Sequence, residues 1–282
     1  MPLKVDVETK LDSEPCVLTW GDKLFIGTED GFIRAFDAKL SPKESWPAHS
    51  VQPFALATDG YNLYSSSNDG GIKVWSMTGK KITELPPTGA DVGALHVFDK
   101  HVYAGDEDGN ILVYENNAMK AKYNVLEEVK DLAFSPPFLF TVRDLYVTAT
   151  EIKPEESKTR FMTRHTMEGR APLRIAGNRL VFMSRDGNNL RLHDASIDTN
   201  FKQLDEVKVS DMIVTCLSAS GDGVWTGGWD GFVRQWKIVG DKLEAAGAVS
   251  LGGCINSLVA TGNGAYAAVT GGKVAYVNAV IL

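Results

Sequence analysis

Cysteine is scarce in this sequence, and its spacing excludes two common roles of that residue. Cys16, Cys216 and Cys254 lie far apart along the chain. An odd number of cysteines cannot all pair, and no two have the close spacing of a zinc-binding motif. The sequence therefore favours free thiols in a reducing compartment. We expect a protein of the cytoplasm, the nucleus or both, and not a secreted one.

Long hydrophobic runs and basic blocks are also missing. No stretch of about 18 apolar residues is present, so we expect no transmembrane helix and no membrane partner. The first ten residues, MPLKVDVETK, lack the apolar core of a signal peptide. The formal net charge is −7. Because nucleic acids are bound mainly by neutralising phosphates with Lys and Arg, an acidic chain without a basic block is poorly suited to that role.

Motifs of catalysis are absent as well. The chain has no Gly-X-Ser-X-Gly elbow and no glycine-rich phosphate loop followed by a helix. No two of the five histidines have metal-ligand spacing. We therefore predict no enzymatic activity, no cofactor and no bound metal.

One pattern of residues recurs along the whole chain. Small residues precede Asp-Gly, and apolar and polar residues alternate after it, as in GTEDGFIRAFD from Gly27 and GGWDGFVRQWK from Gly227. The seven copies have their turns at Asp30, Asp69, Asp108, Asp144, Asp186, Asp230 and Gly271. The copies recur about every 40 residues, a period typical of β-propeller blades.

Each copy predicts a four-stranded antiparallel sheet. Asp-Gly supplies the positive φ angles of a two-residue hairpin turn, and the alternation after it indicates a strand. Such sheets bury both faces only by packing as blades. We predict an all-β, seven-bladed propeller that forms a single domain over residues 1–282. The segment Leu3–Glu8 is expected to close it by pairing with Lys273–Asn278 as the outer strand of blade seven, because an open ring leaves bare sheet edges.

In these features the chain resembles the WD-repeat family, as a divergent member of no identified subfamily. The closing Trp-Asp dipeptide of that family is degenerate here: Phe36-Asp37, Trp75-Ser76, Tyr114-Glu115, His193-Asp194 and Trp236-Lys237. The Gly-His pair that precedes the first strand of a blade survives once, as Ala48-His49. The resemblance implies that blade two keeps a structural hydrogen-bond set: His49, one serine among Ser65 to Ser67, Asp69 and Trp75.

The resemblance also implies a top face, formed by the loops that join blades and by the turns between second and third strands. Several charged residues and one tryptophan are expected there: Glu29, Glu107, Lys130, Arg143, Arg170, Arg185 and Trp229. Blades one to three contribute acidic residues and blades four and five basic ones. Arg and Trp dominate binding hot spots, so we interpret this face as a docking surface for acidic or phosphorylated peptide segments. Ordinary surface charge is the alternative.

The predicted function is thus a non-catalytic scaffold or adaptor that binds proteins, itself monomeric, within a larger complex. One alternative is a subunit associated with RNA or chromatin through the segment from Lys130 to Arg185. Another is a hydrolase with a metal in the central channel, for which Glu14, Asp91 and Glu128 are the nearest ligands. The charged stretch Glu151–Lys158 is expected to be a solvated loop between the third and fourth strands of blade four, with a docking role as the alternative.

Overall fold

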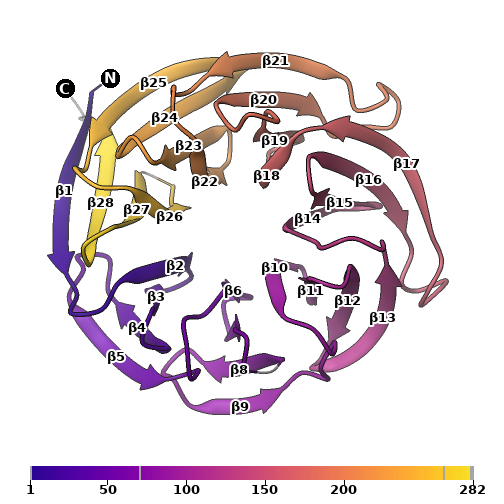
Figure 1. Cartoon of the computed structure of the whole chain (residues 1–282), viewed down its shortest axis with the longest axis horizontal. Helices are drawn as coiled ribbons and strands as arrows, with labels where there is room; N and C mark the ends of the chain where they lie inside the picture. The colour runs from indigo at the N-terminus through magenta and orange to yellow at the C-terminus, as the bar shows by residue number, and fades with distance from the viewer. Residues whose placement is uncertain (1, 70, 263, 280–282) are drawn as a thin grey trace. The chain divides into compact units, whose positions relative to one another are not determined.

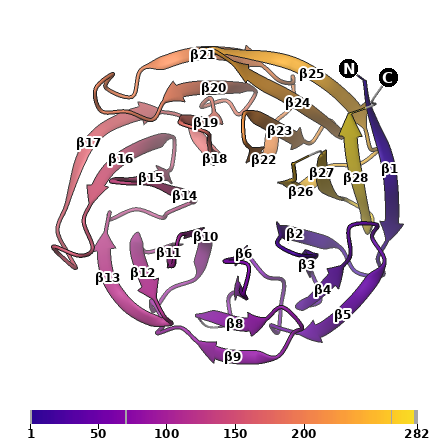
Figure 2. The same cartoon turned by 180° about the vertical axis from the view of Figure 1, so that it is seen from behind.

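All regular elements in the described residues are β-strands. The computed structural model describes residues 2–69, 71–262 and 264–279. Its strands form seven four-stranded sheets (Figures 1 and 2). In this part of the chain no helix is long and apolar enough to cross a membrane. The predicted seven-bladed propeller of antiparallel four-stranded blades is confirmed.

The blades are numbered in chain order, and the strands of each are given from the first to the outer strand. Blade one comprises β2 (Pro15–Trp20), β3 (Leu24–Thr28), β4 (Phe32–Phe36) and β5 (Pro42–Pro47). Blade two comprises β6 (Ala55–Thr58), β7 (Asn62–Ser66), β8 (Ile72–Ser76) and β9 (Lys81–Glu84). Blade three comprises β10 (Val92–Phe98), β11 (His101–Asp106), β12 (Asn110–Glu115) and β13 (Ala118–Asn124). Blade four comprises β14 (Asp131–Ser135), β15 (Phe138–Arg143), β16 (Tyr146–Ile152) and β17 (Phe161–Glu168).

The remaining three blades follow the same order. Blade five comprises β18 (Arg170–Ala176), β19 (Arg179–Met183), β20 (Asn189–Asp194) and β21 (Gln203–Lys208). Blade six comprises β22 (Val214–Ser220), β23 (Gly223–Gly228), β24 (Phe232–Val239) and β25 (Lys242–Ser250). Blade seven comprises β26 (Ile255–Ala260), β27 (Gly264–Val269), β28 (Lys273–Ala279) and β1 (Leu3–Lys10).

The chain divides into two compact units. One contains residues 1–20 and 169–282, and the other contains residues 21–168. Each has its own apolar core: Val181, Leu217 and Trp236 belong to a buried cluster of the first unit, and Tyr103 and Phe134 to one of the second. Fully burying a large apolar side chain stabilises a fold by about 1.5–3 kcal/mol. The expectation of a single domain over residues 1–282 stays a prediction.

The first strand of the chain closes the last blade, as predicted. β1 pairs antiparallel with β28, with Leu3 opposite Ala279 and Lys10 opposite Lys273. The amide of Leu11 continues the pairing by donating to the carbonyl of Gly272 at 2.7 Å. The side chain of Leu3 is buried in the cluster that contains residues of blades six and seven. Closure therefore combines backbone hydrogen bonds with apolar burial.

Every blade has one register shift between its third strand and its outer strand. In blades one to six the shifts lie at Arg34/Phe36, Val74/Trp75, Val113/Tyr114, Ala149/Thr150, Leu192/His193 and Gln235/Trp236. In blade seven the shift lies between Val5 and Val7 of β1. Such a bulge bends a strand and increases its twist. β1 thus has the geometry of an outer strand although it comes from the opposite end of the chain.

The turns between second and third strands differ from the predicted two-residue type. In blade one the amide of Gly31 donates to the carbonyl of Thr28 at 3.0 Å, and Gly31 has a φ of 82°. Asp30 has no positive φ; its carboxylate accepts a hydrogen bond from the amide of Phe32. The equivalent glycine bonds occur at Gly109, Gly187 and Gly231. This is a type I turn followed by a left-handed glycine, so the aspartate serves as an acceptor and only glycine supplies the positive φ.

Blades three and four depart from this scheme. In blade three the accepting carboxylate is that of buried Asp106, which receives the amides of Asp108 at 3.1 Å and Asn110 at 2.7 Å. The predicted turn residue Asp108 is thus a donor through its backbone. In blade four no glycine follows Asp144, and Asp144 itself has a φ of 47°. Aspartate tolerates this conformation better than most residues, which explains why the degenerate copy still forms a turn.

Candidate functional site

Four side chains of blade two form one hydrogen-bonded chain. Nδ1 of His49 lies 2.7 Å from Oδ1 of Asp69, and Nε2 lies 2.7 Å from Oγ of Ser65. Nε1 of Trp75 donates to the same Ser65 oxygen at 2.8 Å. The sequence did not decide which of Ser65, Ser66 and Ser67 takes part, and the structure shows that it is Ser65. The side chain of His49 is fully buried. Its contacts with Ser65 and Asp69, together with the bond from Trp75, join β7 and β8 to the segment that precedes the blade.

The hydrogen-bonding pattern matches a neutral His49. Ser65 accepts the indole N–H of Trp75 and donates its own proton to Nε2, while Nδ1–H donates to Asp69. Protonation of Nε2 would leave the serine hydroxyl without an acceptor. Burial likewise lowers the pKa of His49, against the opposing effect of Asp69. Burial by itself raises the pKa of Asp69, but hydrogen bonds from His49, Ser50 and Lys73 lower it to about 2.

Blade six contains a related set that the sequence analysis missed. Nε1 of Trp236 donates to Oγ1 of Thr226 at 3.0 Å. Asp230 accepts a hydrogen bond from Oγ of Ser210 at 2.8 Å and pairs with Arg234 at 2.7 Å. Ser210 thus contacts the turn aspartate where blade two uses a histidine. The spacing of the residues could have predicted this set, because Thr226 precedes Trp236 by the same ten residues that separate Ser65 from Trp75.

Blade six also presents two exposed apolar side chains on neighbouring loops. Trp229 is 58% exposed and Met212 is 51% exposed. The amide of Trp229 donates to the carbonyl of Ile213 at 3.1 Å, which ties the turn after β23 to the loop before β22. The bond between Ser210 and Asp230 fastens the same loop a second time. Trp229 and Met212 are therefore held on an ordered backbone.

The same loop contacts the turn that carries Arg185. The amide of Val214 donates to the carbonyl of Gly187, and the amide of Val209 donates to that of Asn188, both at 2.9 Å. Arg185 is exposed, and half-buried Arg170 lies beside Gly187. The structure thus brings four side chains of one unit together, three on adjoining loops and Arg170 at the start of β18. We call them the blade-five/six surface: Arg170, Arg185, Met212 and Trp229.

The other predicted binding residues belong to the unit of residues 21–168. Arg143 is only 20% exposed and donates from Nη1 to the carbonyl of Val125 at 2.8 Å. Its guanidinium is thus used inside the protein, which the sequence does not show. Lys130 is exposed, with Nζ 3.9 Å from the carboxylate of Glu128. Glu29 and Glu107 are exposed next to their turns.

Glu14, one of the three residues considered as metal ligands, holds a turn of the protein. The carboxylate of Glu14 accepts the amides of Gly271 and Gly272, at 2.9 and 3.0 Å, and Nδ2 of Asn256 at 3.0 Å. Glu14 therefore holds the turn of blade seven, the copy that lacks an aspartate.

One group of potential metal ligands occurs in the described residues, formed by His101, Glu115 and Glu155. The ammonium group of Lys120 lies among them, 3.2 Å from Nε2 of His101 and 2.8 Å from Oε2 of Glu115, and it also contacts Glu155. Lys120 thus already supplies the positive charge that a metal ion would bring, and the group does not fit a metal centre.

Comparisons with known proteins agree with this geometry. The family model described as WD domain, G-beta repeat, matches residues 40–76 and 202–237, the segments that contain Trp75 and Trp236. The structure of U3-55K has a TM-score of 0.82 at 17% identity and covers 99% of this chain and 98% of its own. That of the RRP9 WD40 repeats has a TM-score of 0.81 at 17% identity and covers 98% and 97%.

Similarity in sequence to curated proteins is more local. Type I inositol polyphosphate 5-phosphatase 13 of Arabidopsis thaliana is 30% identical over 63 residues, which are 22% of this chain and only 6% of that protein's length. The structural likeness at 17% identity shows the fold alone, and the family match lies on the two blades with a Trp-to-Ser or Trp-to-Thr hydrogen bond. The chain therefore contains two segments that match the WD40 repeat and has the β-propeller fold of solved WD40 structures, and it resembles that family as a divergent chain whose subfamily is not identified.

Proposed function

We propose that the protein is a non-catalytic scaffold or adaptor that binds partner proteins through the blade-five/six surface. WD40 propellers typically are protein-interaction scaffolds and are usually non-catalytic. The observation that carries the proposal is the exposure of Trp229 beside Met212 on two loops fastened to each other. Aromatic residues, Met and Arg are enriched in protein interfaces, and Trp and Arg dominate their energetics.

The chemistry of the surface suggests the partner segment. Arg185 and Arg170 lie on the blade-five side of the exposed apolar pair. A guanidinium binds carboxylate or phosphate groups with two parallel hydrogen bonds. The expected ligand is an acidic segment, phosphorylated or not, with one apolar anchor. We further propose that the protein is a monomer in a larger assembly of the cytoplasm or nucleus.

The test is capture of partners from native cells by a Trp229→Ala/Arg185→Glu variant, followed by mass spectrometry. We expect the main partners to be lost while the Tm stays within a few degrees, because Trp229 is exposed and surface substitutions cost little. A Tyr61→Ala/Lys80→Glu variant is the matched control, since both side chains are exposed on blade two. A full set of partners on the folded test variant would overturn the proposal.

Arg143 needs a variant of its own. Its bond to the Val125 carbonyl means that charge reversal removes an internal hydrogen bond as well as a surface charge. A loss of binding in Arg143→Glu is therefore interpretable only beside its Tm.

A further inference from the structure

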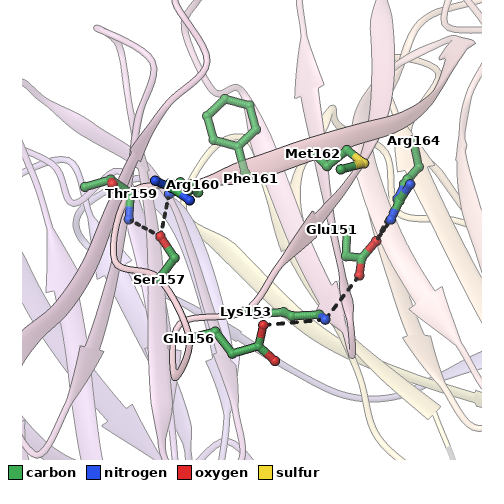
Figure 3. A pocket seen from close by; sticks show the side chains of 9 residues that line it. All are labelled: Glu151, Lys153, Glu156, Ser157, Thr159, Arg160, Phe161, Met162 and Arg164. Carbon is green, nitrogen blue, oxygen red and sulfur yellow. Dashed lines mark hydrogen bonds and ion pairs between the residues drawn. The ribbon is translucent and has the colours of Figure 1, made fainter.

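A pocket lies at the outer edge of blade four, where β16 and β17 are joined by the charged loop 153–160. Its volume is about 650 Å³. We call it the blade-four groove. Its lining residues are Glu151, Lys153, Glu156, Ser157, Thr159, Arg160, Phe161, Met162 and Arg164 (Figure 3). The sequence placed this stretch between the third and fourth strands of blade four, which the structure confirms.

The loop beside the groove is ordered by its own hydrogen bonds and by blade three. The amides of Glu156 and Ser157 both donate to the carbonyl of Lys153 at 2.9 Å. The hydroxyl of Ser157 accepts the amide of Arg160 at 3.1 Å (Figure 3). The amide of Lys122 in β13 donates to the carbonyl of Lys158 at 2.9 Å. A ligand that binds here meets a largely formed site, which lowers the entropic cost of binding.

Apolar side chains are exposed on the strand that borders the groove. Phe161 and Met162 are 39% and 52% exposed. β17 pairs His165 with Ala149 and Thr163 with Thr150, so Arg164 is an extra residue in a bulge. β17 is also the last strand of its sheet. Extended peptides bind at such edges through backbone hydrogen bonds, while adjacent pockets select their side chains.

The charges of the groove leave a positive surplus. Nε of Arg164 lies 2.6 Å from Oε2 of Glu151, and Nζ of Lys153 lies 3.9 and 3.6 Å from the carboxylates of Glu151 and Glu156 (Figure 3). The groove's own carboxylates are thus compensated. Arg160, which lines the groove, is exposed and forms no ion pair within the described part of the chain. The same holds for exposed Lys158 of the adjoining loop and for exposed Lys122 of β13, whose amide donates to the Lys158 carbonyl. In a protein of net charge −7, this local surplus favours an anionic ligand.

We propose that the blade-four groove binds an extended acidic segment of another protein. The segment aligns with the edge of β17, places one apolar side chain against Phe161 and Met162, and directs carboxylates toward Lys158 and Arg160. The apolar pair favours a peptide over a nucleic acid, whose binding depends on many phosphate contacts. This site lies in the unit of residues 21–168 and uses none of the residues of the blade-five/six surface.

The test uses a displayed library of random linear peptides panned on the full chain. Peptides are then counter-selected on a Lys158→Glu/Arg160→Glu variant. We expect enriched sequences that combine Asp or Glu with one aromatic or aliphatic residue, and that bind the variant at least about tenfold more weakly, a difference of about 1.4 kcal/mol. Lys39→Glu/Lys80→Glu is the matched control: it changes the net charge equally, with exposed lysines of the equivalent loops in blades one and two.

Met162→Asp gives an independent readout, because the side chain of Met162 is half exposed and substitutions at exposed positions usually cost little stability. The selected peptides should bind this variant about tenfold more weakly as well, and Trp229→Ala should not affect them. The proposal is overturned if no acidic sequences are enriched, if the charge-reversed and control variants bind them equally, or if a single-stranded oligouridylate binds the groove in their place.

Discussion

At the scale of single residues, the His49 network shows how one side chain connects a loop to a blade. His49 precedes blade two, and its two ring nitrogens contact Asp69 and Ser65, from the turn after β7 and from β7 itself. The backbone amide of Ser50 adds a third link by donating to Asp69 at 2.9 Å. Because the imidazole is fully buried, its two ring nitrogens have no water as a ready replacement for these partners.

We predict that His49→Ala destabilises the protein by about 1–3 kcal/mol, because it leaves buried partners unsatisfied. His165→Ala, on the outer strand β17, should cost much less. Urea unfolding of the two variants beside the parent chain measures the difference. Equal losses at the two positions would contradict the structural role of His49.

The pH dependence of stability gives a second readout of the same network. Burial lowers the pKa of His49 from 6.5, so the unfolded chain takes up a proton at a higher pH than the folded chain. The contribution of His49 is therefore complete above about pH 7 and decreases as the pH falls through 6.5. Asp69, with its pKa lowered to about 2, loses its contribution only in stronger acid, below its ordinary 3.8. His49→Ala should flatten the stability profile near pH 6, and it should also weaken the acid limb, because it removes one of the hydrogen bonds that lower the pKa of Asp69.

At the scale of elements, β1 is the strand whose position depends on chain closure. It pairs with β28 along its length and buries Leu3 in the core between blades six and seven. Just beyond β1, the carboxylate of Glu14 holds the turn between β27 and β28. The N-terminal segment thus completes blade seven both as a strand and as a turn acceptor.

Deleting residues 1–12 should expose the edge of β28 and lower stability, with aggregation as the visible consequence. The Tm should fall by several degrees, and light scattering should detect association. Removal of residues 1–2 alone, ahead of β1, serves as the control. A monomeric truncated protein with the Tm of the parent chain would show that β1 is dispensable.

At the scale of the whole molecule, net charge separates the proposed scaffold from the RNA- or chromatin-associated alternative. Each phosphate neutralised by a protein releases counterions, so binding to nucleic acid weakens steeply as salt rises. An interface built on Trp229 and Met212 should weaken much less, because apolar burial is not screened. For a captured partner we expect its Kd to rise less than about tenfold between 50 and 200 mM salt, against about 10³-fold or more for six to ten phosphate contacts. A steep dependence would favour the nucleic-acid alternative.

Much of the architecture could be predicted because each copy of the repeat is defined by residues close together in the sequence. Asp-Gly turns, alternating strands and a period of about 40 residues specify the number of blades without knowledge of contacts. Closure by residues 3–8 followed from the absence of another outer strand for the last copy. The turn type could not be predicted. Asp-Gly fits both a two-residue turn and a type I turn followed by a left-handed glycine, and hydrogen bonding to the next strand decides between them.

The sequence alone determined the blade count, the closing strand and the absence of known catalytic motifs, since each depends on residue order and spacing. Only the tertiary structure decided which charged side chains form hydrogen bonds to backbone groups within the protein. Arg143 and Glu14 are both charged residues near the turns of the repeat, yet Arg143 bonds to the Val125 carbonyl and Glu14 to the turn of blade seven. The reason is physical: whether a charge is available to a partner depends on the backbone groups packed around it, and those come from segments distant in the chain.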